Sequence, residues 1–427
     1  MTVIESTGDR ADCSLETGGW RYVLTHWLAS RSLIWLAMWG IAPLLAVPTG
    51  SEPPVIGWQA FAWWDGEWYL RIASQGYDYI PDASDYSAVA FFPLYPLLIR
   101  ILASLGFHPA FAGVVVNNAA FFAALLLLYR WLIVRNGAAI ARWTVAGLAW
   151  CPYSLYGSTV YTEGLFILLT AAALRAYERQ QAEGIGGFGV LATATRAPGV
   201  ALIPALGWLA WRDRRSWPTW LAIALIPSGI LLYSLFCWWQ FGDPLAFVHA
   251  QAAWGRSQGF ALADWWQVLM YVLIGVPNYD AGRIVTWGQP LAVLAIAALG
   301  IALWHGRERL GAIAPRLGCL LVVLLWLLGG DPFLTLAMVW GGAALLWYTR
   351  RELGLLLSLY GWVNWGLILS AGRSDSSERL VYSSVALAIA FGVWLARHPR
   401  WGRPLCAFMA LLLVTLAIRF AQQLWVA

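Results

Sequence analysis

Residues 110–134 read AFAGVVVNNAAFFAALLLLYRWLIV, and only Asn117, Asn118 and Arg130 interrupt an otherwise apolar or aromatic run. A helix that crosses a lipid bilayer needs roughly 20 predominantly apolar residues. This run is therefore long enough to span a membrane. Similar runs recur from near residue 26 to residue 424, with short polar breaks between most of them.

The composition agrees with a chain that lies mostly in lipid. Hydrophobic residues make up 60% of the 427 residues, charged residues 11%, and the mean hydropathy is +0.64. Soluble globular domains do not have this balance. The 30 tryptophans gather near the ends of apolar runs, as interfacial belts require. The sequence therefore predicts an all-α polytopic membrane protein.

The predicted spans are short, closely spaced and about 11 to 13 in number. They are residues 26–48, 110–134, 140–157, 160–178, 217–241, 284–304, 317–330, 332–348, 354–371, 380–396 and 404–424. Two further stretches are ambiguous. Pro93 and Pro96 interrupt residues 88–107, so an interfacial or re-entrant helix is as good an interpretation as a span. Residues 186–211 are broken around Arg196 and Pro198.

Arginine placement predicts the topology. With a cytoplasmic amino terminus, most arginine-rich loops face inward. The cluster Arg212, Arg214 and Arg215 joins them only if residues 186–211 enter and leave on the same side. We therefore interpret that segment as a re-entrant hairpin, or a pair of short helices, with Arg196 near its tip.

The same topology predicts the domain organisation. Residues 1–22 are polar and mixed in charge, which predicts a cytoplasmic tail and not a signal peptide. Residues 23–427 then form one transmembrane domain. Its first outer loop, residues 49–109, is long and acidic and contains interfacial helices.

Charge and motifs exclude several classes of partner. The net charge is +5 and the pI is about 9.0, but the basic residues are dispersed in short loops, so topology explains them better than nucleic acid does. The sequence has no P-loop, no HExxH helix and no cluster of His and Cys at ligand spacing. No cofactor or metal is required, although a carboxylate-bound divalent cation stays open. Nothing in the sequence identifies a protein partner.

The strongest local signal is WWDGEWYLRIA at residues 63–73, just after the first span. Its aromatic residues, Trp64 among them, would hold the segment at the membrane surface, where Asp65 reaches both water and lipid head groups. Asp65 is placed to act as a general base on an acceptor hydroxyl; capping of an interfacial helix is the alternative. Glu67 lies two residues after Asp65 and so points to a different side of such a helix. Its side chain is either exposed to solvent or in contact with the substrate.

Isolated charges elsewhere complete the candidate site. An arginine inside an apolar segment usually faces a partner or an aqueous cavity, so Arg196 suggests an anionic ligand. Arg256 and Arg379 also present paired donors suited to phosphate, with snorkelling or ion pairing as the alternative. Glu163 either begins a helix or forms part of a cavity. The remaining candidate substrate contacts are Asp243, Gln251 and Tyr382.

Several of these stretches, in this order, resemble the PIG-V family, whose eukaryotic members are GPI mannosyltransferases. The matching pieces are Trp64-Asp65 with Gly76-Tyr77, Phe91 to Pro96, Tyr161 to Phe166, Ala194 to Gly199, Gly242 to Phe247 with Trp254 to Arg256, and Glu378-Arg379. The resemblance implies a C-type (GT-C) membrane glycosyltransferase of a bacterial plasma membrane. Such an enzyme takes a sugar, usually mannose, from a polyprenyl-phosphate carrier at the outer face, and Asp65 would be its catalytic carboxylate.

The two lines of evidence predict one mechanism. Asp65 deprotonates a hydroxyl of a lipid or glycan acceptor, which attacks the anomeric carbon with inversion, while arginines stabilise the leaving phosphate. The competing interpretation is a transporter or lipid flippase. Transporters often contain a pair of matching broken helices, and the sequence shows no second segment like 186–211.

Overall fold

The computed structural model describes residues 8–48, 53–255 and 259–426, and the regular secondary structure of this part of the chain is helical, apart from one isolated bridge between Gly259 and Ala371. The prediction of an all-α protein is confirmed. The longest helices are α1 (Gly8–Trp35), α4 (Pro109–Arg135), α14 (Gly288–Leu310), α15 (Ala314–Tyr348), α16 (Arg350–Leu369) and α19 (Pro399–Ala421).

Shorter helices connect and surround these. They are α2 (Asp65–Gln75), α3 (Leu94–Ser104), α5 (Ala138–Trp150), α6 (Glu163–Glu178), α7 (Ala182–Thr195), α8 (Leu202–Arg212), α9 (Trp217–Leu225), α10 (Ser228–Phe241), α11 (Ala246–His249), α12 (Leu262–Leu273), α13 (Val276–Asp280), α17 (Ser377–Tyr382) and α18 (Val385–Arg397). Two 3-10 turns also matter for the site, η5 (Pro152–Gly157) and η6 (Ala197–Ala201).

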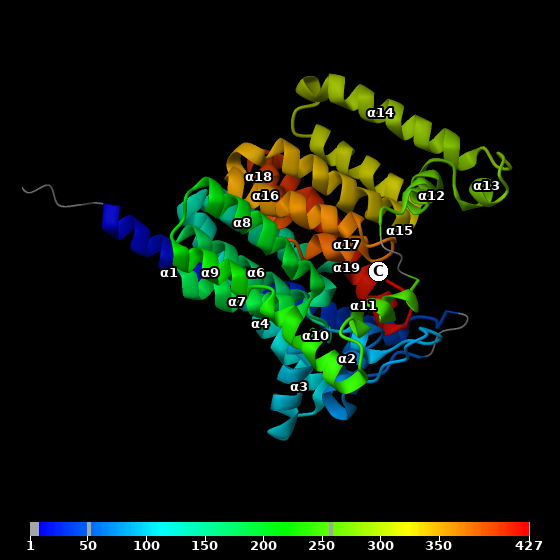
Figure 1. Ribbon diagram of the computed structural model, residues 1–427. Coiled ribbons are helices and arrows are strands. Elements are labelled where there is room, and N and C mark those ends of the chain that lie inside the picture. Colours follow the sequence, from blue (N-terminus) through cyan, green and yellow to red (C-terminus); the bar gives the residue numbers. More distant parts are fainter. Residues whose placement is uncertain (1–7, 49–52, 256–258, 427) are drawn as a thin grey trace, which may run out of the picture.

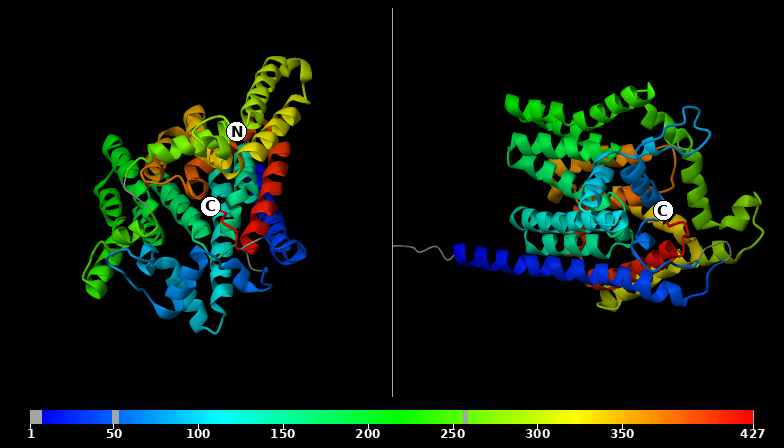
Figure 2. Two further views of the ribbon diagram at one scale, coloured as in Figure 1. Left: turned by 90° about the vertical axis from the view of Figure 1, so that its right-hand side faces the viewer. Right: turned by 90° about the horizontal axis from the view of Figure 1, so that it is seen from below.

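Six helices of the described chain are long and apolar enough to cross a membrane, by length and composition: α4, α9 with α10, α14, α15, α16 and α19. The chain is an integral multi-pass membrane protein. Other predicted spans correspond to shorter helices; residues 160–178 are α6, with 16 residues, and 380–396 are α18, with 13. Figures 1 and 2 show most helices side by side in one bundle, with α14 at its edge.

Helix α15 covers two of the predicted spans, 317–330 and 332–348. Its backbone leaves helical geometry at Gly330, where φ is 55° and ψ is −140°, and Pro332 follows. Only glycine adopts a positive φ without strain. The element is therefore two helices joined at Gly330.

Two predicted segments take a more definite form. Helix α1 begins at Gly8, so residues 8–22 of the predicted tail are helical, while residues 1–7 lie outside the described part of the chain. In the ambiguous stretch 88–107, the helix α3 has 11 residues. At 1.5 Å per residue it is about 17 Å long, which is too short for a span.

The segment 186–211 folds back on itself at Arg196. A Cβ atom on Gly199 would lie 2.9 Å from the carbonyl group of Ala192, so η6 packs directly against the last turn of α7. The far end of α8 returns towards α6, because the guanidinium of Arg215 lies 5.1 Å from the ring centre of Tyr177. Arg196 therefore lies at the turn between α7 and α8.

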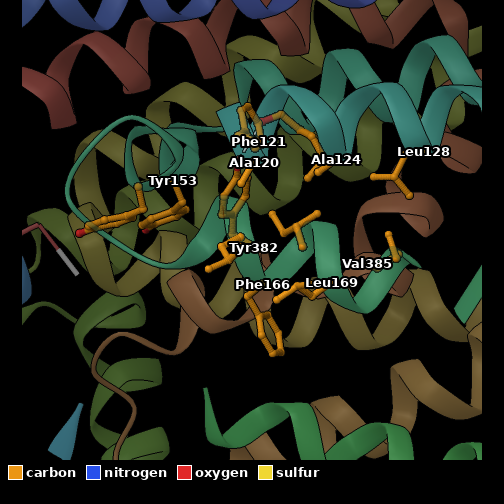
Figure 3. Close-up of a cluster of buried hydrophobic side chains, with 14 of the residues drawn as sticks. Ala120, Phe121, Ala124, Leu128, Tyr153, Phe166, Leu169, Tyr382 and Val385 are labelled. Atoms are coloured by element: carbon orange, nitrogen blue, oxygen red, sulfur yellow. Dashed lines mark hydrogen bonds between the residues drawn. The ribbon is translucent and has the colours of Figure 1, made fainter. Parts of the chain in front are cut away.

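The core is built where α4, α5, α6 and α18 pack together (Figure 3), with Phe121, Leu128, Phe166 and Val385 among its buried side chains. Small residues bring the backbones close. A Cβ on Gly392 of α18 would lie 2.0 Å from Thr144 Oγ1 of α5. Close approach through small residues is how helices associate in membranes, where burial from water supplies no driving force.

Candidate active site

A cavity of about 820 Å³ lies at one end of the bundle and is lined by residues that are far apart in the sequence. Its walls come from the first loop, the turn at Arg196, the segment around α11, the segment leading into α17, and the end of the chain. Lining residues include Asp65, Tyr69, Asp82, Phe91, Arg196, Pro198, His249, Gln251, Trp254, Leu367, Arg373, Asp375, Arg379 and Trp425.

Asp65 is the first residue of α2 and follows a strained residue. Trp64 has φ 60° and ψ −119°, a conformation that costs of order 1–3 kcal/mol for a non-glycine residue and persists only where the surroundings impose it. The surroundings are the segment before α6: Val160 N donates to Phe61 O at 2.8 Å, and a Cβ on Gly66 would lie 3.3 Å from Val160 O. Packing therefore fixes where the Asp65 carboxylate points.

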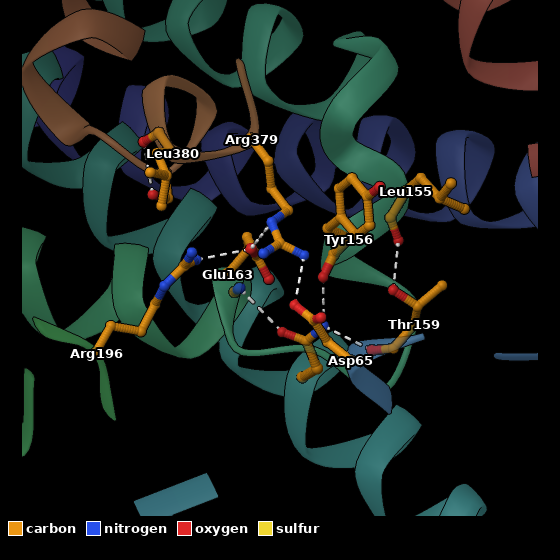
Figure 4. Close-up of polar contacts among 11 residues, drawn as sticks. Asp65, Leu155, Tyr156, Thr159, Glu163, Arg196, Arg379 and Leu380 are labelled. Atoms are coloured by element: carbon orange, nitrogen blue, oxygen red, sulfur yellow. Dashed lines mark hydrogen bonds and ion pairs between the residues drawn. The ribbon is translucent and has the colours of Figure 1, made fainter. Parts of the chain in front are cut away.

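Four charged side chains of alternating sign meet at the cavity (Figure 4). Arg379 Nη1 donates to Asp65 Oδ2 at 2.7 Å, and Arg196 Nη1 donates to Glu163 Oε1 at 2.7 Å. Arg379 Nε lies 3.4 Å from the same Glu163 oxygen. The order Asp65, Arg379, Glu163, Arg196 thus forms one network with no net charge.

This charged network is largely removed from water. The exposed fraction of the side chain is 1% for Glu163, 8% for Arg379, 11% for Arg196 and 20% for Asp65. The guanidinium of Arg379 also lies 5.3 Å from the ring centre of Tyr156 and 5.2 Å from that of Tyr161. Buried charges are stable only when they are paired and well surrounded, so the position of each member depends on the others.

Two asparagines of α4 position the start of α6. Asn117 Nδ2 donates to Tyr156 O at 2.6 Å and to Thr159 O at 2.8 Å, and its Oδ1 accepts from Gly164 N at 2.9 Å. Asn118 Nδ2 donates to Ser158 O at 3.1 Å. These bonds satisfy backbone groups of an irregular segment inside the helical bundle. They explain the polar pair in the apolar run at 110–134.

Other predicted residues surround the cavity without joining the network. Gln251 lines it and donates to Ala90 O at 3.4 Å. Trp64 does not line it but packs edge-on against Trp425, which does, with ring centres 5.2 Å apart. Glu67 lies outside the lining, and partial burial raises the pKa of its carboxyl group.

The predicted contact Asp243 is set back from the cavity. Its Oδ2 accepts from Tyr79 Oη at 2.6 Å and lies 2.7 Å from His249 Nδ1, and His249 is the one of the three that lines the cavity. Burial raises the pKa of Asp243, but hydrogen bonds from Tyr79, His249 and its own loop outweigh this and lower it overall. Asp243 thus supports His249 rather than the cavity directly.

Tyr382 lies away from the cavity, contrary to the interpretation that it contacts substrate there. Its side chain is buried, and its hydroxyl donates to Leu148 O at 3.3 Å in the helical core. It follows Arg379 by three residues on α17, and its ring reaches the backbone of α5 at Leu148. Arg256 falls outside the described residues.

Sequence reasoning missed several polar residues near the site. Arg373 and Asp375 line the cavity and are bonded to each other, and Arg373 also donates to Trp254 O. Arg31 is buried in α1 and donates to Ser154 O at 2.8 Å, which holds the η5 turn. An arginine inside a predicted span was the available signal for Arg31, as it was for Arg196.

Within residues 8–48, 53–255 and 259–426, no three His, Cys, Asp or Glu side chains group as metal ligands. The two carboxylates of the charged network, Asp65 and Glu163, each bond to a guanidinium.

Comparisons with known proteins found structural likeness alone. No family model matches the chain, and no curated protein matches it. Solved structures similar to it include the oligosaccharyltransferase of Archaeoglobus fulgidus with zinc and sulfate, at 15% identity and a TM-score of 0.45 over 92% of this chain and 53% of that one. The same enzyme in complex with an inhibitory peptide and a dolichol-phosphate is 14% identical and has a TM-score of 0.45, over 94% of this chain and 56% of that one.

A second similar protein is ArnT from Cupriavidus metallidurans bound to undecaprenyl phosphate, at 12% identity and a TM-score of 0.39 over 86% of this chain and 77% of that one. This chain spans about half the length of the oligosaccharyltransferase. The residues of the cavity therefore carry the functional assignment.

Proposed function

We propose that this protein is a membrane glycosyltransferase. It transfers a hexose, mannose by the resemblance of its motifs, from a polyprenyl-phosphate donor to a hydroxyl of a lipid or glycan acceptor at the outer membrane face, with inversion. One observation carries the proposal: Asp65, Arg379, Glu163 and Arg196 come from four distant segments and meet as one buried network beside a cavity of about 820 Å³.

The donor phosphate binds at the arginines. A guanidinium has five N–H donors, and the ion pairs described use Nη1 of Arg196 and Nη1 and Nε of Arg379. Both residues line the cavity, so their other N–H groups serve an anion there. Two fixed cations in a site with little water stabilise the charge that grows on a leaving phosphate.

Asp65 acts as the general base. Its Oδ2 is held by Arg379, which leaves Oδ1 to take the proton of the acceptor hydroxyl. Inversion requires base and leaving group on opposite faces of the sugar. Arg196 is the cation farther from Asp65 along the network, because Glu163 and Arg379 lie between them. We therefore place the phosphate at Arg196, with Arg379 between phosphate and base.

The step balances without another reactant. The acceptor oxygen forms a bond to the anomeric carbon, the bond from that carbon to the phosphate oxygen breaks, and the hydroxyl proton moves to Asp65. Polyprenyl phosphate leaves with the bonding electrons.

A transporter is the second candidate, because a second interrupted helix does occur in the structure. Helix α15 breaks at Gly330, and Asp331 beside it pairs with Arg419 at 2.8 Å. The two breaks are unlike, however, since Arg196 lines the cavity while Asp331 does not.

Transfer of radiolabelled sugar from polyprenyl-phosphate mannose tests the proposal, in membranes with matched protein levels. We expect Asp65→Asn to lower the rate by about 10²–10⁴-fold, the usual contribution of a general base, with donor binding retained. Asp85→Asn, in the same loop but exposed, is the control and should keep full activity. Equal transfer by wild type and Asp65→Asn would rule out Asp65 as the base.

A further inference from the structure

The segment after α19 reaches into the cavity and presents an aromatic ring there. Trp425 lines the cavity, and half of the residue is exposed. Its ring stands at 89° to that of Trp64, the residue before Asp65, and 38% of Trp64 is exposed. Figure 1 shows this part of the chain, in red, at the end of the bundle where α11 and α17 lie.

Polar contacts fix the backbone that carries this ring. Arg419 donates to both carboxylate oxygens of Asp331, at 2.9 and 2.8 Å, and its Nη2 also donates to Trp425 O at 2.7 Å. Gln422 Nε2 donates to Ala46 O at 3.3 Å, and Val426 is buried. An anchored backbone with a half-exposed indole is arranged to contact something in the cavity, not to fill a core.

Other exposed tryptophans lack this arrangement. Trp239 on α10 is 78% exposed and lines no described cavity. An interfacial position explains such a residue, but it does not explain a ring aimed beside a carboxylate.

The chemistry of the two rings matches a pyranose. One face of a pyranose carries C–H groups and its rim carries hydroxyls, so the sugar can lie flat on an indole while the rim hydrogen-bonds to a carboxylate. Trp425 touches Trp64, and Trp64 directly precedes Asp65, so a sugar on Trp425 lies on the base side of the network and not on the Arg196 side.

We propose that Trp425 is the surface on which the acceptor's sugar ring stacks, so that the acceptor is a glycan or glycolipid whose attacking hydroxyl belongs to a pyranose. This inference rests on the proposed function, in which Asp65 takes the proton of the acceptor. It also narrows that function, because a lipid alcohol without a sugar would gain nothing from Trp425.

Kinetics with two acceptors test the specificity. The probes are octyl mannopyranoside and 1-octanol, each with the mannose donor and the full chain. We expect Trp425→Ala to raise the KM for octyl mannopyranoside by about 2- to 13-fold, the worth of one aromatic contact, and Trp425→Phe to restore most of it. The KM for the donor and all values for Trp239→Ala should stay at wild-type level. A rise in the donor KM alone, or an equal loss with 1-octanol, would overturn the proposal.

A binding measurement separates this inference from the proposed function. Saturation-transfer NMR with octyl mannopyranoside, on the full chain in nanodiscs, needs no turnover. Signals from the ring C–H protons should be present with wild type and Trp239→Ala and weak with Trp425→Ala. They should also weaken in Asp331→Asn. This variant keeps the indole of Trp425 but weakens the hold of Asp331 on Arg419, which anchors the Trp425 backbone. Equal signals in all four proteins would refute the stacking role even if transfer is found.

Discussion

Helix α6 begins and ends with a glutamate, and each is paired with an arginine, yet the two pairs differ in every other respect. Glu163 is 1% exposed and bonds to Arg196, with Arg379 close by. Glu178 is 30% exposed and bonds to Arg135, with Trp131 Nε1 as a second donor. The same type of ion pair is therefore buried at one end of the helix and partly exposed to solvent at the other.

The difference teaches where a charge matters. An exposed ion pair contributes about 0–1 kcal/mol, since water and salt screen it. A buried member cannot be removed without leaving an unpaired charge. Arg135 is the last residue of α4, and many of the 27 basic residues likewise lie at or near helix ends, where topology explains them. The arginines that meet Glu163 lie in a buried network instead, and the proposed function uses them to bind the donor phosphate.

The largest contrast should come from neutralising each glutamate. Glu163→Gln leaves two buried guanidiniums and a single carboxylate, Asp65, which bonds to Arg379 and not to Arg196. We therefore expect a loss of about 3–5 kcal/mol in the free energy of unfolding. Glu178→Gln should cost about 0–1 kcal/mol. Thermal unfolding in one detergent measures both, and similar losses for the two variants would show that the network is not the buried unit described.

Arginine geometry gives the second contrast. Arg196→Lys keeps the charge but loses the planar fork, so donor affinity should fall by about 10- to 150-fold, the equivalent of a hydrogen bond to a charged group at about 1.5–3 kcal/mol. Arg212→Lys, at the exposed end of α8, should bind donor as wild type does. Binding of radiolabelled polyprenyl-phosphate mannose checks this, and unchanged affinity in Arg196→Lys would show that the donor phosphate binds elsewhere.

Glycines test the packing that holds the site. A Cβ on Gly164 would lie 2.6 Å from Asn117 O and from Asn117 Oδ1, so Gly164→Ala should cost about 1–3 kcal/mol of stability. A Cβ on Gly207 of α8 would meet no atom within 4 Å. Gly207→Ala should therefore be neutral or stabilising by up to about 1 kcal/mol. Equal melting temperatures for the two variants would contradict the close approach of α4 and α6.

The smallest effect concerns pH. Glu378 lies on α17, outside the six long apolar helices, and burial raises its pKa from 4.5 to about 7, with the nearby Asp331 adding to the rise. The folded state thus binds more protons than the unfolded state between these pH values, so stability falls as pH rises through that window. We expect Glu378→Gln to shrink the stability difference between pH 6 and pH 8 by about 1–2 kcal/mol. An unchanged difference would exclude this carboxyl group.

Much of the fold could be predicted because helices that span a membrane are visible in the sequence as long apolar runs. The two helices of α15 were predicted as separate spans, residues 317–330 and 332–348, and the structure breaks between them at Gly330. The all-helical class follows from the need to satisfy backbone groups within each segment in lipid.

The site was predictable only in part. Asp65 was chosen from the aromatic segment at residues 63–73, and Arg196 and Arg379 because the predicted topology put them on one side; the structure brings all three to one cavity. Tyr382 was misplaced, because the facing of a six-residue helix depends on tertiary packing. Trp425 follows a predicted span, where a belt tryptophan looks the same in sequence.

The asparagine pair of α4 has a consequence for how the protein assembles in the bilayer. With a mean hydropathy of 2.1 over its most apolar window, α4 is apolar enough to enter the membrane with both asparagines in place. Once inserted, their amides have no water to bind and gain from meeting the carbonyls of residues 156–159. Hydropathy thus brings the helix into the membrane, and two side chains then select the segment against which it packs.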